Sequence, residues 1–142
     1  MRRSALTFLI LATALGAADA LELRIRIMAQ LAKLLITKER PIIYMPPKEY
    51  EVAKNFAAIR TTQRCKEADI LFIHTPRSLP AECLFERQPM IILLSYKSYL
   101  QNRHRAVGAF FWQKGRPNII LNRTLIQNLG ITIPDEYKKY EE

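Results

Sequence analysis

Apolar residues recur at helical spacing in the segment that follows residue 20. Five of them occupy positions i, i+1, i+4, i+7 and i+8: Ile27, Met28, Leu31, Leu34 and Leu35. Positions with this spacing lie along one side of a helix, so the pattern predicts an amphipathic helix over residues 21–38. Apolar and charged residues alternate at the start of this segment, and that part taken alone is typical of a strand.

Three later segments are short and almost wholly apolar: 41–44, 70–73 and 90–94. Strands that lack an apolar–polar alternation are usually covered on both faces, as in parallel sheets. Residues 48–58 have near-helical apolar spacing, and 59–62 are expected to be a short extended piece. Residues 78–85 are expected to form a short helix or a loop. Strands separated by helical segments predict an α/β fold.

The last third of the chain has a different pattern. Residues 106–112 are rich in aromatic side chains and 119–121 are apolar and β-branched, with a loop rich in turn residues at 113–118. This arrangement predicts an antiparallel hairpin. Asn122 is expected to cap a short helix that ends at Gly130, before an extended stretch and a final helical turn over 135–140. The predicted fold is a single compact α/β domain with a mixed sheet, parallel strands plus a C-terminal antiparallel hairpin, flanked by helices.

The first twenty residues have the layout of a secretory signal peptide. Arg2 and Arg3 precede a short apolar run at 6–15, and Ala18 and Ala20 provide small residues at the positions that a signal peptidase reads. The apolar run is shorter than the roughly 20 residues that cross a bilayer. We therefore expect cleavage after residue 20 and a periplasmic domain over 21–142, without stable membrane insertion. The alternatives are a buried N-terminal helix and an uncleaved anchor.

The chain is strongly basic. It has 22 Lys and Arg residues against 13 Asp and Glu residues, a formal net charge of +9. A basic surface favours acidic partners: a nucleic acid, an anionic lipid, a glycan with carboxylates or an acidic protein face. Export argues against nucleic acid. The charge is also consistent with solubility alone.

Cys65 and Cys83 are the two cysteines of the chain. An even number of cysteines in an oxidising compartment favours one disulfide, and the alternative is two buried thiols. Such a bridge would stabilise the fold by about 3 kcal/mol in the chain-entropy model. His74 and His104 have no ligand spacing with either cysteine, so no metal site and no cofactor are expected.

The densest group of basic residues follows the apolar run at 90–94. It begins after Ser95 and includes Lys97, Arg103 and Arg105. Ligands of open α/β sheets gather beyond the carboxyl ends of the strands, and guanidinium groups bind carboxylates and phosphates. We expect a ligand or partner site here, with His74 and Thr75 at the same rim. The alternative is an ordinary charged connection.

The predicted hairpin offers two further candidates for a binding site. Lys114 and Arg116 lie on either side of Gly115, where backbone N–H groups and cationic side chains can approach one anion together. The alternative is a solvated hairpin tip. Phe110 and Trp112 are expected on one face of the strand and Phe111 on the other. Trp112 is either a core residue or an anchor of an interface.

Several local signatures of the chain resemble the YfiR-like family of small periplasmic proteins. They are Cys65 before the strand at 70–73, Leu93-Leu94-Ser95 leading to Tyr99-Leu100, Gly108-Ala109-Phe110-Phe111, Lys114-Gly115-Arg116, Ile119-Ile120-Leu121-Asn122 and Leu129-Gly130-Ile131. The single cysteine pair and the polar ending at 135–140 depart from the family pattern. The resemblance implies a fold like one lobe of a periplasmic binding protein. It also implies a regulator that contacts the sensory domain of an inner-membrane signalling protein, without catalytic residues.

No catalytic motif is present in the sequence. We therefore expect an exported, non-enzymatic binding or regulatory protein that acts through contact with an envelope signalling protein. The alternative is a single-lobed solute-binding protein for a small anionic ligand linked to transport. That alternative requires a concave pocket at the strand ends that is lined by Ser95, Lys97 and Arg103.

Overall fold

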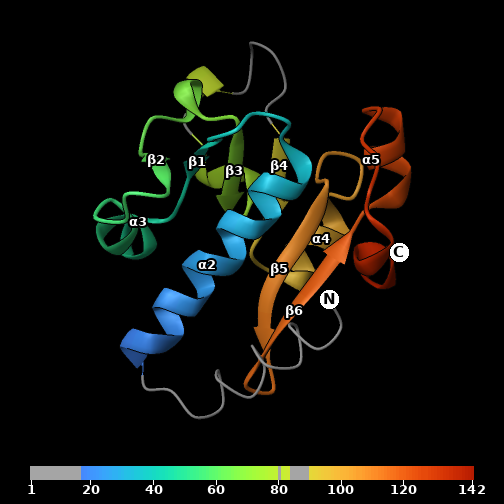
Figure 1. Cartoon of the computed structure of the whole chain (residues 1–142). Helices are drawn as coiled ribbons and strands as arrows, with labels where there is room; N and C mark the ends of the chain where they lie inside the picture. Colours follow the sequence, from blue (N-terminus) through green and yellow to red (C-terminus); the bar gives the residue numbers. More distant parts are fainter. Residues whose placement is uncertain (1–16, 80, 84–89) are drawn as a thin grey trace.

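The computed structural model describes residues 17–79, 81–83 and 90–142, which form one domain around a six-stranded sheet (Figure 1). The strand order is β2-β1-β3-β4-β5-β6. All neighbouring pairs are parallel except β5 and β6, which form an antiparallel hairpin. The predicted mixed α/β fold is confirmed. The strands are β1 (Ile42–Tyr44), β2 (Arg60–Thr62), β3 (Ile70–Ile73), β4 (Met90–Leu93), β5 (Gly108–Gln113) and β6 (Arg116–Leu121).

Four α-helices and four short 3₁₀ helices connect or flank the described strands. The α-helices are α2 (Ala17–Leu35), α3 (Pro47–Ala53), α4 (Tyr96–Gln101) and α5 (Arg123–Asn128). The 3₁₀ helices are η1 (Cys65–Glu67), η2 (Pro76–Ser78), η3 (Ala81–Cys83) and η4 (Asp135–Tyr140). Figure 1 shows α2 lying across one face of the sheet, with α4 behind the opposite face.

The sheet separates two groups of buried side chains. Ile70 and Phe72 of β3 pack with the buried side of α2, while Leu71 and Ile73 pack on the other face with Tyr99 of α4. All four residues of β3 are buried. This explains the unbroken apolar pattern at 70–73, because a strand covered on both sides has no position for a polar side chain.

The expected alternation around Trp112 is confirmed. Phe110 and Trp112 pack on the α2 face, and Phe111 packs on the α4 face. The loop expected at 113–118 is instead a two-residue turn, because Arg116 and the residues after it pair with β5. Lys114 and Gly115 have φ values of 54° and 71°. Positive φ at both central residues is the geometry that matches the twist of a two-residue hairpin.

The helix signals near Asn122 are also confirmed. Its side-chain oxygen accepts a hydrogen bond from the Leu125 N–H at 3.2 Å, and its Nδ2 donates to the Arg103 carbonyl at 2.7 Å. Gly130 has a φ of 74°, the left-handed conformation that commonly ends a helix. The final turn at 135–140 is a 3₁₀ helix.

Helix α3 is shorter than expected. It ends at Ala53, whereas the apolar spacing predicts helix to residue 58. After Ala53 the backbone bonds become i→i+3, from Asn55 N–H to the Val52 carbonyl and from Phe56 N–H to the Ala53 carbonyl. The segment at 78–85 contains the end of η2 and all of η3, and residues 80, 84 and 85 lie outside the described residues.

Most of the expected signal peptide, residues 1–16, also lies outside the described residues. Residues 17–20 form the first turn of α2, and the first buried core residue of that helix is Leu23. In the described part of the chain, no helix combines the length and the apolar character that a membrane crossing requires.

Gly108 lies where β6 passes very close to β5. A Cβ atom at this position would overlap the backbone carbonyl oxygen of Ile120. We expect Gly108→Ala to destabilise the protein by about 1–3 kcal/mol, because a backbone atom of the neighbouring strand cannot move aside as a flexible side chain does. The midpoint of urea unfolding measures the effect.

Gly115→Asn is the matched control, because no atom lies within 4 Å of a Cβ there and Asn tolerates positive φ. Equal unfolding midpoints for Gly108→Ala, Gly115→Asn and the wild type would contradict this expectation. They would show that β5 and β6 can move apart around the added methyl group without a loss of stability.

Candidate functional site

The parallel strands bring several chain segments together at one edge of the sheet. Strands β1, β3, β4 and β5 run in the same direction, so their carboxyl ends share an edge. Within the sheet, β2 pairs with one edge of β1 and β3 pairs with the other edge, so the direction of the connections reverses at β1. Ligands of open α/β sheets bind beyond the carboxyl ends of the strands, near such a reversal.

A cavity of about 490 Å³ lies at this carboxyl edge. It is lined by Arg24 of α2, Glu49 of α3, His74 after β3, Leu94, Ser95 and Tyr96 after β4, and Phe110, Phe111, Trp112 and Gln113 of β5. We refer to it as the carboxyl-edge cavity. The volume is within the range of small-molecule sites.

An ion pair occupies one wall of the carboxyl-edge cavity. Arg24 Nη1 lies 3.1 Å from Glu49 Oε2, and only 6% of the Glu49 side chain is exposed. The Arg24 guanidinium also lies 5.6 Å from the centre of the Trp112 ring. A buried carboxylate needs such a partner, because an unpaired charge is strongly disfavoured inside a protein. Arg24 therefore neutralises Glu49 and covers the indole at the same time.

Four aromatic side chains, Tyr96, Phe110, Phe111 and Trp112, form a large part of the remaining wall. The ring of Tyr96 packs against Phe111 with a centroid distance of 5.4 Å, and Phe110 meets Trp112 edge to face at 6.3 Å. Tyr96 is 44% exposed, and with Leu100 and Leu129 it is one of three exposed large apolar side chains among the described residues. Trp112 and Phe111 are half-buried. We call Tyr96, Phe111 and Trp112 the aromatic rim.

Three of the residues singled out from the sequence line this cavity: His74, Ser95 and Trp112. The Ser95 hydroxyl caps α4 by accepting a hydrogen bond from the Ser98 N–H at 3.2 Å. Thr75 does not line the cavity and instead caps η2, where its hydroxyl accepts a hydrogen bond from the Arg77 N–H.

Lys97 and Arg103 do not line the carboxyl-edge cavity. Lys97 is exposed on α4. Arg103 forms an ion pair with Glu142 at 2.8 Å, and its guanidinium lies 5.7 Å from the centre of the Tyr99 ring. The basic run after β4 is therefore spread over different surfaces, because α4 turns the chain away from the edge.

Lys114 and Arg116 lie beside the carboxyl-edge cavity, at the tip of the hairpin. They line a smaller hollow of about 390 Å³ with Gln113 and Asn118, and Gln113 is common to both spaces. Both basic side chains are exposed.

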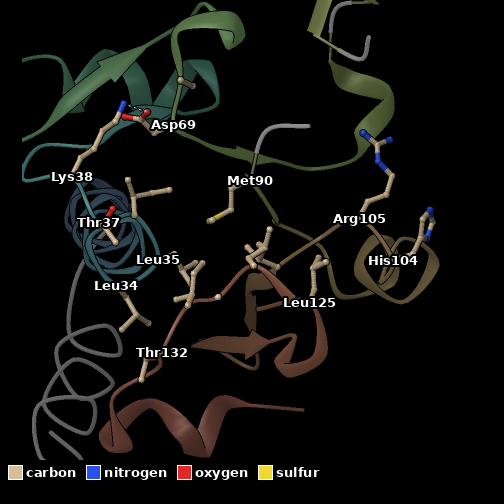
Figure 2. Close-up of a pocket in the computed structure, with 16 residues that line it drawn as sticks. Leu34, Leu35, Thr37, Lys38, Asp69, Met90, His104, Arg105, Leu125 and Thr132 are labelled. Carbon is tan, nitrogen blue, oxygen red and sulfur yellow. Dashed lines mark hydrogen bonds and ion pairs between the residues drawn. The ribbon is translucent and has the colours of Figure 1, made fainter. Parts of the chain in front are cut away.

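Arg105 belongs to the opposite edge of the sheet. It lines a separate cavity of about 800 Å³ near the amino ends of β4 and β5, which we call the amino-edge cavity (Figure 2). His104 lies beside it. The sequence gives no sign of this cavity, because its walls come from segments that share no motif.

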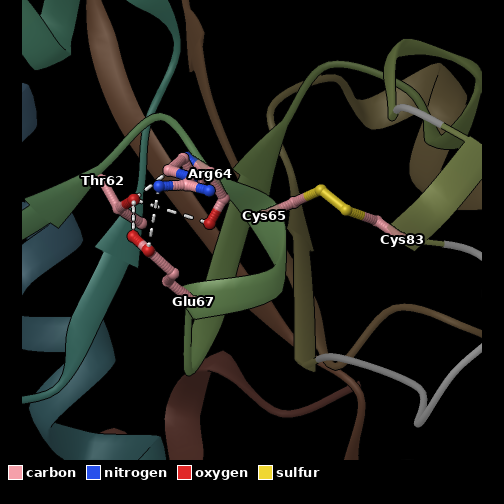
Figure 3. Close-up of a disulfide and its surroundings, with 5 residues drawn as sticks. All are labelled: Thr62, Arg64, Cys65, Glu67 and Cys83. Carbon is pink, nitrogen blue, oxygen red and sulfur yellow. Dashed lines mark hydrogen bonds and ion pairs between the residues drawn. A yellow bond between two sulfur atoms is a disulfide. The ribbon is translucent and has the colours of Figure 1, made fainter.

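Cys65 and Cys83 form a disulfide, as expected, with a Cα–Cα distance of 6.1 Å (Figure 3). It joins η1 to η3. Next to it, the Thr62 hydroxyl accepts a hydrogen bond from the Arg64 N–H at 2.9 Å and donates one to Glu67 at 3.1 Å. These bonds hold the turn that presents Cys65. In the disulfide neither sulfur is available as a nucleophile or a metal ligand.

Within the ranges 17–79, 81–83 and 90–142, no group of three His, Cys, Asp or Glu side chains has the placement of a metal site. The carboxyl-edge cavity holds one histidine, and its one carboxylate is already paired with Arg24.

Arg24 and Glu49 are the site residues that the sequence reasoning missed. Glu49 follows β1 by a few residues, so the rule that places sites at strand ends could have indicated it. Arg24 has no local signal, because its position depends on how α2 crosses the sheet.

Comparisons of the chain with protein-family models, curated proteins and solved structures found no match.

Tyr99 gives the fold a distinct response to alkaline pH. Burial, and then the hydrogen bond that its hydroxyl donates to Glu142 at 2.8 Å, raise the pKa of Tyr99 above its ordinary value of 10. Above pH 10 the unfolded chain loses this proton while the folded chain retains it. The contribution of Tyr99 to stability is therefore complete below pH 10 and declines as the pH rises above it.

We expect the free energy of unfolding to fall less steeply above pH 10 in Tyr99→Phe than in the wild type, as measured by urea unfolding between pH 8 and pH 11. Tyr96→Phe is the control, with the same substitution at an exposed position of the same helix. Parallel curves for Tyr99→Phe and the wild type would contradict the assignment.

Proposed function

We propose that this protein is an exported, non-enzymatic binding protein that contacts another protein of the cell envelope through the aromatic rim. The observation that carries the proposal is the exposure of Tyr96, at 44%, where it packs on Phe111 at the carboxyl edge, while Trp112 lines the same cavity from the other face of β5. Aromatic and arginine side chains that gather on one surface are typical of the residues that dominate protein interfaces.

The charges around the rim favour an acidic partner surface. Lys114 and Arg116 are exposed next to the carboxyl-edge cavity, and residues 21–142 contain 20 Lys and Arg against 12 Asp and Glu. Complementary charge accelerates association and orients the partner. Arg24 contributes to the shape of the carboxyl-edge cavity but not to its net charge, because its positive charge is balanced by the negative charge of Glu49.

The alternative, a binding protein for a small anionic solute, has less support at this edge. Of Ser95, Lys97 and Arg103, Ser95 alone lines the carboxyl-edge cavity. Among the described lining residues, Arg24 is the one Lys or Arg, and it is paired. An anion would have to compete with a buried carboxylate for that guanidinium.

The proposed location and partner class rest on the sequence. The layout of residues 1–20 is that of a signal peptide, and the resemblance to the YfiR-like family implies a periplasmic regulator that contacts an inner-membrane signalling protein. The rim supplies a surface of the chemistry that such a contact requires.

Site-specific photo-crosslinking in intact cells tests the surface. We expect a photoreactive phenylalanine analogue in place of Tyr96 to capture one envelope protein, and the same analogue in place of Leu129 not to capture it. Leu129 is the matched control because it is a comparably exposed apolar residue at 52%. Equal capture from both positions, or none from Tyr96, would refute the proposal.

Once the captured protein is identified, its affinity measures the role of Trp112. We expect Trp112→Ala to weaken binding roughly tenfold or more, as for a central aromatic of an interface. Leu129→Ala should change the affinity for the captured protein by less than about twofold relative to the wild type. Circular dichroism of both variants confirms that they are folded.

The proposed export has a direct readout. We expect the periplasmic fraction to contain a chain that begins at Leu21, as determined by mass spectrometry of its N-terminal peptide. A chain that retains residues 1–20 and stays in the cytoplasm would contradict export. Replacing Ala18 and Ala20 by Leu should block processing and provides the matched test of the cleavage site.

A further inference from the structure

The amino-edge cavity is larger than the carboxyl-edge cavity and is separate from the aromatic rim. It lies between the end of α2, the first residue of β4, the residue before β5, and α5 with the segment that follows it (Figure 2). Its volume of about 800 Å³ is within the range of sites for drug-sized ligands.

The walls of this cavity are mostly apolar. Leu35 and Val107 are almost fully buried and form its inner part, while Leu129 is 52% exposed at its border. The remaining apolar lining residues are Leu34, Ile36, Ala68, Met90, Leu125 and Ile131. Such a surface favours a ligand with an extended apolar portion, since burial of apolar area is the main source of affinity there.

The charged residues of the cavity lie on two sides. Figure 2 shows Lys38 with Asp69 on one side and Arg105 with His104 on the other. Lys38 Nζ is 2.6 Å from Asp69 Oδ1, and Asp69 Oδ2 accepts the Ile42 N–H at 2.8 Å. This pair is neutral as a unit, so it does not call for a charged ligand group.

Arg105 has a different environment. It is half-buried, and its Nε atom is buried without a hydrogen-bond partner among the described residues. The Nε atom has almost no accessible surface, so the terminal Nη groups of the guanidinium are the ones that a ligand in the cavity can reach. Two described Lys or Arg residues line this cavity, Lys38 and Arg105. Lys38 is paired with Asp69, and Arg105 has no ion-pair partner among the described residues.

We propose that the amino-edge cavity binds a long-chain carboxylate. Its apolar chain lies between α2 and α5, and its carboxylate pairs with the guanidinium of Arg105. One apolar body and one negative charge match the apolar walls and the single unpaired cation. The guanidinium geometry suits a carboxylate, because two parallel N–H groups can donate to its two oxygens.

Isothermal titration calorimetry with decanoate tests the proposal, with 1-decanol and acetate as partial probes. We expect one decanoate per chain, weaker binding of decanol and no binding of acetate. Arg105→Gln should weaken decanoate binding roughly tenfold and leave decanol binding unchanged, because it removes a charged hydrogen bond and retains the length of the side chain.

Arg123→Gln is the matched control, with the same loss of charge at an exposed residue of α5 outside the cavity. A second pair of variants tests where the ligand binds and leaves the buried core of the protein unchanged. Leu129→Glu at the border should weaken decanoate binding by repulsion, while Gln127→Glu, at an exposed position of α5 outside the cavity, should not.

Three results would overturn the proposal: no decanoate binding to the wild type, equal losses for Arg105→Gln and Arg123→Gln, and decanol binding as tight as decanoate binding. Backbone NMR shifts locate the ligand. Changes centred on Val107 and Leu125 support the amino-edge cavity, and changes centred on Trp112 refute it. The melting temperatures of the variants separate loss of binding from loss of folding.

Discussion

The packing of α2 across the sheet is the constraint on which both cavities depend. The helix buries Ile25, Met28 and Leu31 against the strands, so its axis is fixed over the whole domain. Its first half then places Arg24 at the carboxyl edge, and its last turn places Leu34 and Leu35 at the amino edge. One apolar stripe thereby sets the walls of two cavities at opposite edges of the sheet.

The ion pair between Arg24 and Glu49 links this packing to the surface. Glu49 is almost fully buried, so Arg24 is needed both for stability and for the shape of the carboxyl-edge cavity. The cation above Trp112 also limits the movement of the indole, because an attraction to the ring face favours one orientation. Trp112 of the aromatic rim therefore belongs to the same packing unit as α2 and α3, while Tyr96 and Phe111 pack on the α4 side of the sheet.

The sequence was sufficient for the features that depend on local pattern. The unbroken apolar run at 70–73 indicated a strand covered on both faces, and Asn122 and Gly130 indicated the ends of α5. The hairpin loop was predicted too long because Pro117 and Asn118 are turn residues by composition. In the structure they belong to β6, and an edge strand tolerates a proline.

The candidate site was predictable only in part. The strand-end rule correctly brought His74 and Ser95 to one cavity. It did not place Arg103, whose partner Glu142 lies 39 residues further along the chain. Arg24, Glu49 and the amino-edge cavity depend on contacts between distant segments, and a pattern read along the chain contains no information on those contacts.

The two-residue turn of the hairpin has a consequence for recognition. Lys114 and Gly115 are held at positive φ by the pairing of Gln113 with Arg116, so the backbone that carries the basic tip is already ordered before any partner arrives. Ordering of loops and side chains is a major entropic cost of association, and a preorganised tip avoids the backbone part of it. The charges of Lys114 and Arg116 are thus displayed from a stiff support, with conformational freedom confined to their side chains.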